Sequence, residues 1–159
     1  MYKYNSTTKT YQKYKDTKKC SITVTGLKAE KRYLFKVAAY KKKDGITKIG
    51  KKSAVCTAYT APKQLKAVKI TAPKTVSKGS SRNMVQLKWK KVSGATGYRV
   101  YYKTAAKSSW KLLKKTSAVS MKISVKKGKT NYFRVAAYRT KNKLTTVGKY
   151  SETVKYSAK

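Results

Sequence analysis

The sequence predicts an all-β protein, an antiparallel β-sandwich of two related modules in tandem. Three observations predict this fold. Apolar and polar residues alternate with a period of two, turn-forming residues recur about every 8 to 12 residues, and one segment of the chain occurs twice. No long segment has the helical spacing of apolar residues. Short strands at these intervals are typical of a sandwich in which each strand gives one face to a shared core.

An internal repeat organises the chain of 159 residues. Residues 31–40 read KRYLFKVAAY and residues 129–138 read KTNYFRVAAY. The offset of 98 continues without a gap to Ser53 and Ser151, and 11 of these 23 positions are identical. Lysine-rich composition does not explain the shared Phe, Val-Ala-Ala-Tyr, Thr, Gly and Ser, so we interpret the similarity as a true repeat.

The first copy is shorter than the second at its N-terminal side. Upstream of the repeated segment the offset becomes 99, so Met1 aligns with Val100, whereas the second copy begins near Pro62. We therefore expect a partial module at residues 1–61 and a complete module at residues 62–159. The same offset aligns two further pairs of apolar residues, Ile22 with Met121 and Val24 with Ile123.

The second copy shows the predicted strands most clearly. Residues 85–89 alternate apolar and polar side chains, and so do residues 98–102. The segment 91–97 between them reads KVSGATG and is rich in turn formers. Two further breaks, Lys126–Lys129 and Lys141–Lys143, separate the later strands. Period-two alternation predicts that each strand is buried on one face only.

The charge balance excludes most catalytic chemistry. The chain has 42 Lys and Arg, four acids and no histidine, for a net charge of +38. Four scattered carboxylates do not readily supply a base, an acid and an orienting partner, so we expect no catalytic residues and no enzyme. Two cysteines without histidine do not provide a zinc site, and no phosphate-binding glycine motif occurs. We expect no metal and no cofactor.

The sequence has no segment that would be expected to span a membrane. No apolar run approaches the roughly 18 residues that a membrane-spanning helix requires. The opening residues MYKYN also lack the apolar stretch of a secretory signal.

The second copy resembles a fibronectin type III module of the bacterial type. The residues that carry the resemblance are VQLKWKKVSGATGYRVYYK at 85–103, NYFRVAAYR at 131–139 and VGKYSETV at 147–154. In that family strand B ends in a core tryptophan, here Trp89, and strand C carries Gly-Tyr-x-Val, here Gly97 to Val100. The resemblance implies immunoglobulin-like sandwiches in tandem, and a first module that lacks strands A, B and most of C. It also implies a non-catalytic part of a longer extracellular or cell-surface protein.

One position departs from the family pattern. The family's corner tyrosine stands six residues after a strand-end leucine, which gives Tyr33 after Leu27 but Asn131 after Val125. Two outcomes are compatible with this change: Asn131 makes a smaller polar contact in the corner, or the loop shifts by one residue.

Strand parity predicts which side chains are buried. The inward aromatic residues are expected to form the cores: Tyr98, Tyr102, Phe133, Trp89, Phe35 and Tyr33. Cys20 and Cys56 share the parity of core residues, so we expect two buried free thiols. In the resembled topology they lie on strands of opposite sheets, which does not favour a disulfide.

Outward parity in the second module identifies a candidate binding face for anionic polymers: Arg99, Tyr101, Tyr132, Arg134 and Lys155. Rings beside cations suit stacking on bases or sugars together with neutralisation of phosphates. Exposed tyrosines flanked by lysines also occur on sheets that bind nothing, so both interpretations stay open.

The basic residues are mostly lysine, 37 against five arginines, which favours long-range attraction to polyanions over sequence-specific base reading. We expect a spacer or adhesion module that associates with an anionic polymer, either a cell-wall phosphate polymer or a polysaccharide. The alternative is a non-specific nucleic-acid-binding protein that uses the basic, tyrosine-bearing face. A third interpretation is that the lysine content reflects composition without a selected ligand.

Overall fold

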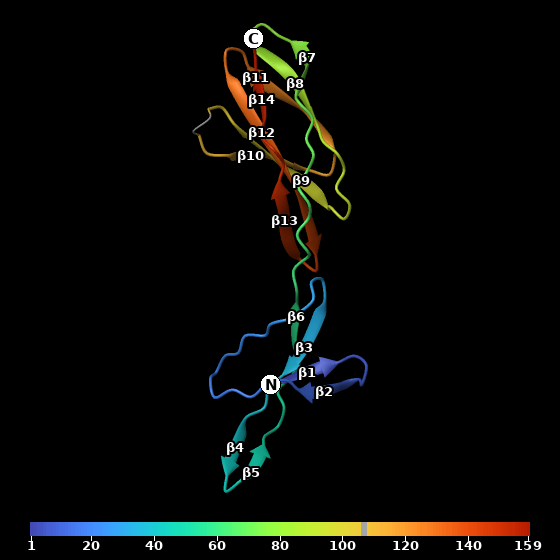
Figure 1. Cartoon of the computed structure of the whole chain (residues 1–159), viewed down its shortest axis with the longest axis vertical. Coiled ribbons are helices and arrows are strands. Elements are labelled where there is room, and N and C mark those ends of the chain that lie inside the picture. Colours follow the sequence, from blue (N-terminus) through green and yellow to red (C-terminus); the bar gives the residue numbers. More distant parts are fainter. Residues whose placement is uncertain (106–107) are drawn as a thin grey trace. The chain divides into compact units, whose positions relative to one another are not determined.

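The structure is a computed structural model that describes residues 1–105 and 108–159. It falls into two compact units, Met1–Ala61 and Pro62–Lys159, which are described separately (Figure 1). The described residues contain strands and no helix, and every strand pair is antiparallel. Within the same residues no helix is therefore long and apolar enough to cross a bilayer. The predicted all-β, antiparallel fold is confirmed.

The second unit is a two-sheet sandwich. Its larger sheet has the order β10 (Lys111–Thr116), β9 (Gly97–Lys103), β12 (Thr130–Lys141) and β13 (Leu144–Tyr150), and β14 (Val154–Ser157) also pairs with β12. Its smaller sheet has the order β11 (Ser120–Lys126), β8 (Arg82–Lys88) and β7 (Lys74–Lys78). Both predicted strands of this copy are therefore present, as β8 and β9.

The core of the second unit lies between these two sheets. Val85 and Leu87 of β8 are fully buried, as are Val100 of β9 and Val135 of β12. Trp89 follows β8 and packs edge-on against Tyr98, with ring centroids 5.7 Å apart. These contacts follow from the period-two pattern, because each strand turns alternate apolar side chains toward the opposite sheet. The other core members are Val68, Ile123, Val125, Phe133, Ala137 and Ala158.

The corner position differs between the two units. In the first unit the hydroxyl of Tyr33 accepts a hydrogen bond of 2.8 Å from the backbone N–H of Lys28. In the second unit Asn131 is buried, and its Nδ2 donates to the carbonyl of Lys129 at 3.3 Å. The shorter amide thus makes a local polar contact in place of the tyrosine, which is the first of the two outcomes compatible with the sequence.

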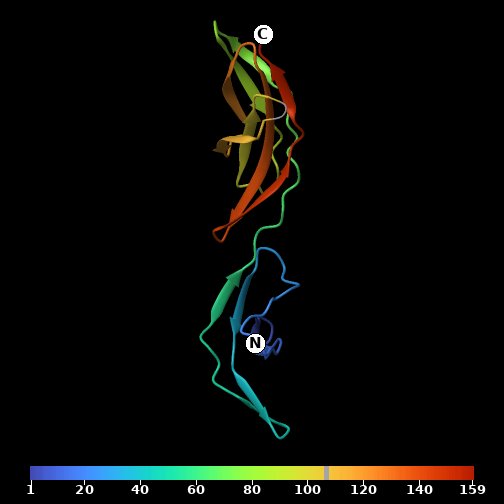
Figure 2. The same cartoon turned by 90° about the vertical axis from the view of Figure 1, so that its left-hand side faces the viewer.

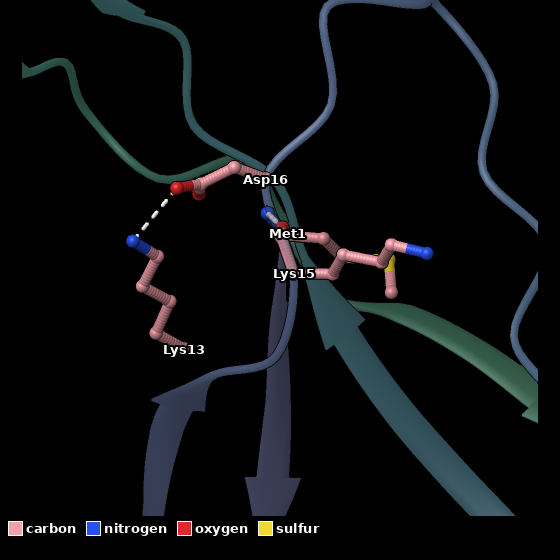
Figure 3. A network of polar contacts seen from close by, with 4 residues as sticks. All are labelled: Met1, Lys13, Lys15 and Asp16. Atoms are coloured by element: carbon pink, nitrogen blue, oxygen red, sulfur yellow. Dashed lines mark hydrogen bonds and ion pairs between the residues drawn. The ribbon is translucent and has the colours of Figure 1, made fainter.

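The first unit contains one four-stranded sheet and one hairpin. The sheet has the order β2 (Thr10–Lys13), β1 (Tyr2–Asn5), β3 (Arg32–Lys36) and β6 (Cys56–Tyr59). The hairpin pairs β4 (Tyr40–Lys43) with β5 (Ile46–Ile49). The N-terminal amine donates a 2.7 Å hydrogen bond to the carbonyl of Lys15 beside the β1–β2 ladder (Figure 3).

The sheet of the first unit matches the larger sheet of the second in register. Lys3 faces Phe35 as Tyr102 faces Phe133, and Phe35 faces Cys56 as Phe133 faces Val154. The hairpin β4–β5 pairs in the same register as β12 with β13. Ser53 also accepts a hydrogen bond from the N–H of Val37 at 3.1 Å, as Ser151 does from Val135 at 3.0 Å. The repeat found in the sequence is therefore also a repeat of backbone pairing.

The first unit has no strands that correspond to the smaller sheet of the second. All of residues 1–61 are described, and none of them forms a counterpart of β7, β8 or β11. The segment that aligns with β11 runs between β2 and β3 without strand pairing, which both views show (Figures 1 and 2). One face of the sheet therefore lacks a second paired sheet, although Phe35 on that face is only 8% exposed.

The prediction of two buried cysteines is wrong. Cys20 and Cys56 are both exposed free thiols. Strand parity places Cys56 on the inner face correctly, since it pairs with Phe35 as Val154 pairs with Phe133. The inner face is covered only in part in the first unit: Phe35 is 8% exposed, whereas Val37 on the same face is 55% exposed and Cys56 is also exposed. Parity predicts which face a side chain occupies, and what packs over that face determines whether the side chain is buried.

The two units should differ in folding cooperativity. We expect residues 62–159 alone to melt in one cooperative transition, because their apolar faces cover each other. Residues 1–61 alone should melt without a sharp transition and bind a hydrophobic dye, because no second sheet covers the inner face and Val37 on it is 55% exposed. Calorimetry and dye fluorescence on the two fragments measure this. Sharp melting of monomeric residues 1–61 would contradict the account.

Candidate ligand-binding face

The five predicted face residues lie on three adjacent strands of the larger sheet of the second unit. Arg99 and Tyr101 are on β9, Tyr132 and Arg134 on β12, and Lys155 on β14. Tyr101 is directly opposite Arg134, and Tyr132 is opposite Lys155. Cross-strand partners have Cβ atoms about 5 Å apart, so their side chains meet on the same face of the sheet.

Arg134 is the centre of this face. Its guanidinium carbon lies 3.8 Å from the ring centroid of Tyr150, 4.3 Å from that of Trp110 and 5.6 Å from that of Tyr101. Tyr101 and Tyr150 also pack edge to face, with centroids 5.4 Å apart. A guanidinium between aromatic rings is attracted by their electron-rich faces and is partly shielded from water. Arg134 therefore brings together three aromatic rings: that of Tyr101 in β9, that of Trp110 just before β10, and that of Tyr150 at the end of β13.

Two further cations extend the pattern along the sheet. Lys103 places its Nζ 5.1 Å from the ring centroid of Trp110 and 5.4 Å from that of Tyr132. Arg99 places its guanidinium carbon 5.7 Å from the ring centroid of Tyr138. Lys155 is exposed and makes none of the ring contacts recorded in residues 1–105 and 108–159. The structure thus brings four of the five predicted residues into one cation–aromatic layer, with Lys155 at its edge.

A glycine in β9 makes the Tyr138 contact possible. Gly97 pairs with Tyr138 across the strands, and a Cβ atom on Gly97 would lie 2.7 Å from the Tyr138 hydroxyl oxygen. Any larger residue would displace the ring, so the glycine of the Gly-Tyr-x-Val signature gives the tyrosine room to lie over the sheet.

Sequence reasoning missed four members of the layer: Lys103, Trp110, Tyr138 and Tyr150. Lys103 and Tyr138 share the outward parity of Arg99 and Arg134, so extending the alternation along β9 and β12 would have identified them. Trp110 and Tyr150 lie beyond register shifts, within β10 and between Ala136 and Tyr138 in the β12–β13 pair. A bulge changes parity, and sequence alternation alone does not locate bulges.

The environment of Tyr150 raises the pKa of its hydroxyl above the ordinary value for tyrosine. Partial burial raises the pKa of its hydroxyl, and a hydrogen bond with Tyr101 raises the same pKa further. The positive charges of Arg134 and Arg99 act in the opposite direction but do not reverse the shift. A neutral phenol hydrogen-bonds to its neighbour, so this contribution to stability is present at neutral pH and is lost as the pH rises through the raised pKa.

The same face of the first unit carries an equivalent layer. Lys36, the counterpart of Arg134, places its Nζ 4.9 Å from the ring centroid of Tyr11, the counterpart of Trp110. Lys52, the counterpart of Tyr150, places its Nζ 4.5 Å from the ring centroid of Tyr2. The rings of Tyr4 and Tyr11 are 5.2 Å apart. Alternating cations and rings are therefore a shared feature of this sheet face in both units, although the individual residues differ.

Comparison with known proteins identifies the fold. No family model and no curated protein matches the sequence. Among solved structures, the crystal structure of the chicken CNTN1 FN1–FN3 domains matches with a TM-score of 0.57 and 20% identity. That match covers 84% of this chain and 45% of the CNTN1 structure, so the chain spans less than half of its length. The sixth fibronectin type III domain of human fibronectin type III domain containing protein 3 matches at a TM-score of 0.46 and 19% identity, over 62% of this chain and 90% of that domain. The chain has a fibronectin type III-like fold, as the sequence predicts.

Arg134 should stabilise the second unit through its ring contacts. We expect Arg134→Ala to lower the free energy of unfolding by about 1 to 2 kcal/mol, because a partly desolvated cation–aromatic cluster is lost. Lys155→Ala removes an equal charge from the edge of the same face and should change the free energy of unfolding by less than about 0.5 kcal/mol. Urea unfolding followed by tryptophan fluorescence measures this in the whole chain, since both tryptophans lie in the second unit. Equal effects of the two substitutions would contradict this role of Arg134.

Proposed function

We propose that the chain is a non-catalytic spacer and adhesion module of a larger bacterial surface or secreted protein, and that it associates with anionic polymers. The polymers that fit are cell-wall phosphate polymers and acidic polysaccharides. The observation that carries the proposal is the excess of 42 Lys and Arg over four acids on a small β-sandwich fold. Such a field concentrates polyanions near the surface and lets several phosphates be neutralised at once.

Internal pairing leaves most of this charge available. Lys13 and Asp16 form an exposed ion pair at 2.7 Å (Figure 3). The hydrogen bond and charge of each partner raise the pKa of Lys13 and lower that of Asp16. An exposed pair of this kind contributes little to stability. Four carboxylates cannot neutralise 42 cations, so the surface remains strongly positive whatever their pairing.

The geometry of the cation–aromatic layer favours binding by charge over binding by base stacking. The rings of Tyr101, Tyr150 and Trp110 already lie against Arg134, and the ring of Tyr132 lies against Lys103. A nucleic-acid base would have to displace these cations to stack on the occupied ring faces. A polymer phosphate or carboxylate needs only to pair with the outward cations and does not have to displace them. This difference between stacking and ion pairing supports the polyanion proposal, and the experiment below tests nucleic-acid binding as the alternative.

The residues present also support a role without catalysis. The chain has no histidine, and in residues 1–105 and 108–159 no group of three or more Cys, Asp or Glu side chains comes together. The proposed module acts by its charge and by the spacing that folded units provide.

Binding should depend on charge density and very little on the outward tyrosines. We expect similar affinities for duplex DNA, a heparin-like chain and a teichoic-type phosphate polymer at equal charge density. All three should weaken with salt in proportion to the charges neutralised. The double variant Tyr101→Ala, Tyr132→Ala should change these affinities by less than about twofold. Titration of each polymer at several salt concentrations measures this.

Two comparisons separate the alternatives in that titration. Tyr59→Ala is the matched control, because Tyr59 is 45% exposed and makes none of the ring–cation contacts recorded in the described residues. Base stacking would make single-stranded DNA bind more tightly than duplex, and would cost about 1 to 3 kcal/mol for each tyrosine removed. A selective loss of that size for single strands, absent in Tyr59→Ala, would overturn the surface-module proposal in favour of nucleic-acid binding.

A further inference from the structure

A hollow in the second unit lies apart from the outward face described above. Its volume is about 550 Å³, which is in the size range of small-molecule sites. Both sheets line it with apolar side chains: Tyr102, Leu113 and Phe133 from the larger sheet, and Ile123 and Val125 from β11 of the smaller sheet. Since both sheets of the second unit are present, this hollow does not arise from a missing layer.

The repeat gives a similar hollow in the first unit, and there a phenol ring lines it. Tyr33 lines the first hollow where Asn131 lines the second, and these two residues are equivalent in the repeat. The Tyr33 hydroxyl accepts a 2.8 Å hydrogen bond from the N–H of Lys28, and the Nζ of Lys3 lies 4.9 Å from the Tyr33 ring centroid. The counterpart of Lys28 is Lys126, which lines the second hollow. A phenol ring therefore fits at this place in the repeat.

Asn131 leaves the equivalent space in the second unit unfilled. Its side chain carries no ring, and its Nδ2 turns back to donate a 3.3 Å hydrogen bond to the carbonyl of Lys129. The space that the Tyr33 ring fills in the first unit is therefore open in the second, beside the buried side chains of Val125 and Phe133.

The backbone donor that the phenol uses is also available in the second unit. The N–H of Lys127 donates to the carbonyl of Ser81 at 3.0 Å, one residue beyond the paired residues Lys126 and Arg82. Hydrogen-bonded and non-hydrogen-bonded pairs alternate along an antiparallel ladder, so the N–H of Lys126 points away from β8. Within residues 1–105 and 108–159, β11 is an edge strand with no partner on that side. This N–H can therefore donate to a ligand.

The charges around the hollow favour an anion. Three exposed cations, Arg82, Lys126 and Lys129, form a rim around the apolar lining, and no acid is among the described residues that line it. The guanidinium of Arg82 is held by Ser124, whose hydroxyl accepts a 2.8 Å hydrogen bond from Nε. A carboxylate is attracted to this rim, and a cationic ligand is repelled.

We propose that this hollow binds a small phenolic carboxylate, a ligand with a hydroxyl at one end of an aromatic ring and a carboxylate at the other. The ring packs against Val125 and Phe133, and its hydroxyl oxygen accepts a hydrogen bond from the N–H of Lys126. The carboxylate pairs with Lys129 at the rim. The site does not depend on the polymer-binding proposal, because Arg134 and the other residues of the outward face do not line it.

Chemical-shift titration of the whole chain with para-hydroxyphenylacetate tests this proposal. We expect a saturable shift of the Lys126 amide resonance, because this N–H gains an acceptor. Acetate carries the same charge without the ring and should give no saturable shift at the same concentrations. Phenol carries the ring without the charge and should bind about tenfold more weakly. Physiological ionic strength screens the non-specific attraction of single charges during the titration.

Asn131→Tyr should fill the hollow from within the chain. Without any probe, this variant should move the Lys126 amide resonance in the same direction as the probe does and should raise the melting temperature. It should bind the probe about tenfold more weakly or worse, because the added ring occupies the site. Ser117→Tyr is the matched control: it adds the same ring at an exposed position between β10 and β11 and should bind as the unaltered chain does.

A second pair of variants tests the rim. Lys129→Gln should weaken binding of the probe about threefold or more, because an exposed cation that pairs with the carboxylate is lost. Lys155→Gln removes an equal charge from the outward face and should leave the affinity unchanged.

Four results would overturn the proposal. A Lys126 shift as large with acetate as with the probe would show that charge alone is recognised. Phenol binding as tightly as the probe, or equal binding by Lys129→Gln and Lys155→Gln, would remove the role of the rim. Undiminished binding by Asn131→Tyr would place the ring elsewhere. The comparison of the three probes uses the unaltered chain, so it decides the matter even if Asn131→Tyr does not fold.

Discussion

An apolar sheet face has to be covered, and this requirement explains most differences between two units whose strand pairing is otherwise the same. In the second unit β7, β8 and β11 cover the larger sheet, and Val100, Phe133 and Val135 are excluded from water. In the first unit the same pairing exists without that second sheet, so Val37 and Cys56 on the inner face meet solvent, while Phe35 on the same face is still only 8% exposed. Burial here depends on the neighbouring sheet and not on the strand itself.

The outward faces of the two larger sheets are stabilised by contacts between cations and aromatic rings and not by apolar burial. Their side chains alternate between cations and rings, and the cations lie over the rings of neighbouring strands. Arg134 with Tyr150 and Lys36 with Tyr11 show this in the second and first unit respectively. Ring contacts give a basic side chain a stabilising partner where acidic partners are scarce. The chain can thus carry a large positive charge on ordered strands while leaving that charge available to an outside polyanion.

Residue patterns were sufficient to predict the fold and half of the side chains in the cation–aromatic layer. Period-two alternation identified β8 and β9, and the repeat identified which strands of the first unit correspond to those of the second. Parity failed where information from outside the strand was needed. Cys56 is on the predicted face, but its exposure depends on a layer that its own strand does not encode. Tyr150 joins the cation–aromatic layer across a register shift, which alternation along one strand cannot locate.

Hydrogen exchange of the free whole chain tests most directly the claim that the units share one sheet and differ in its cover. The comparison is between the amides of segment 20–27 and those of its counterpart β11. Since β11 is paired with β8 and its counterpart is unpaired, we expect slow exchange in β11 and exchange close to the unprotected rate in residues 20–27. The strands β3 and β12 should both be protected. Equal protection of segment 20–27 and β11 would contradict the account, because it would mean that the first unit already has a second layer.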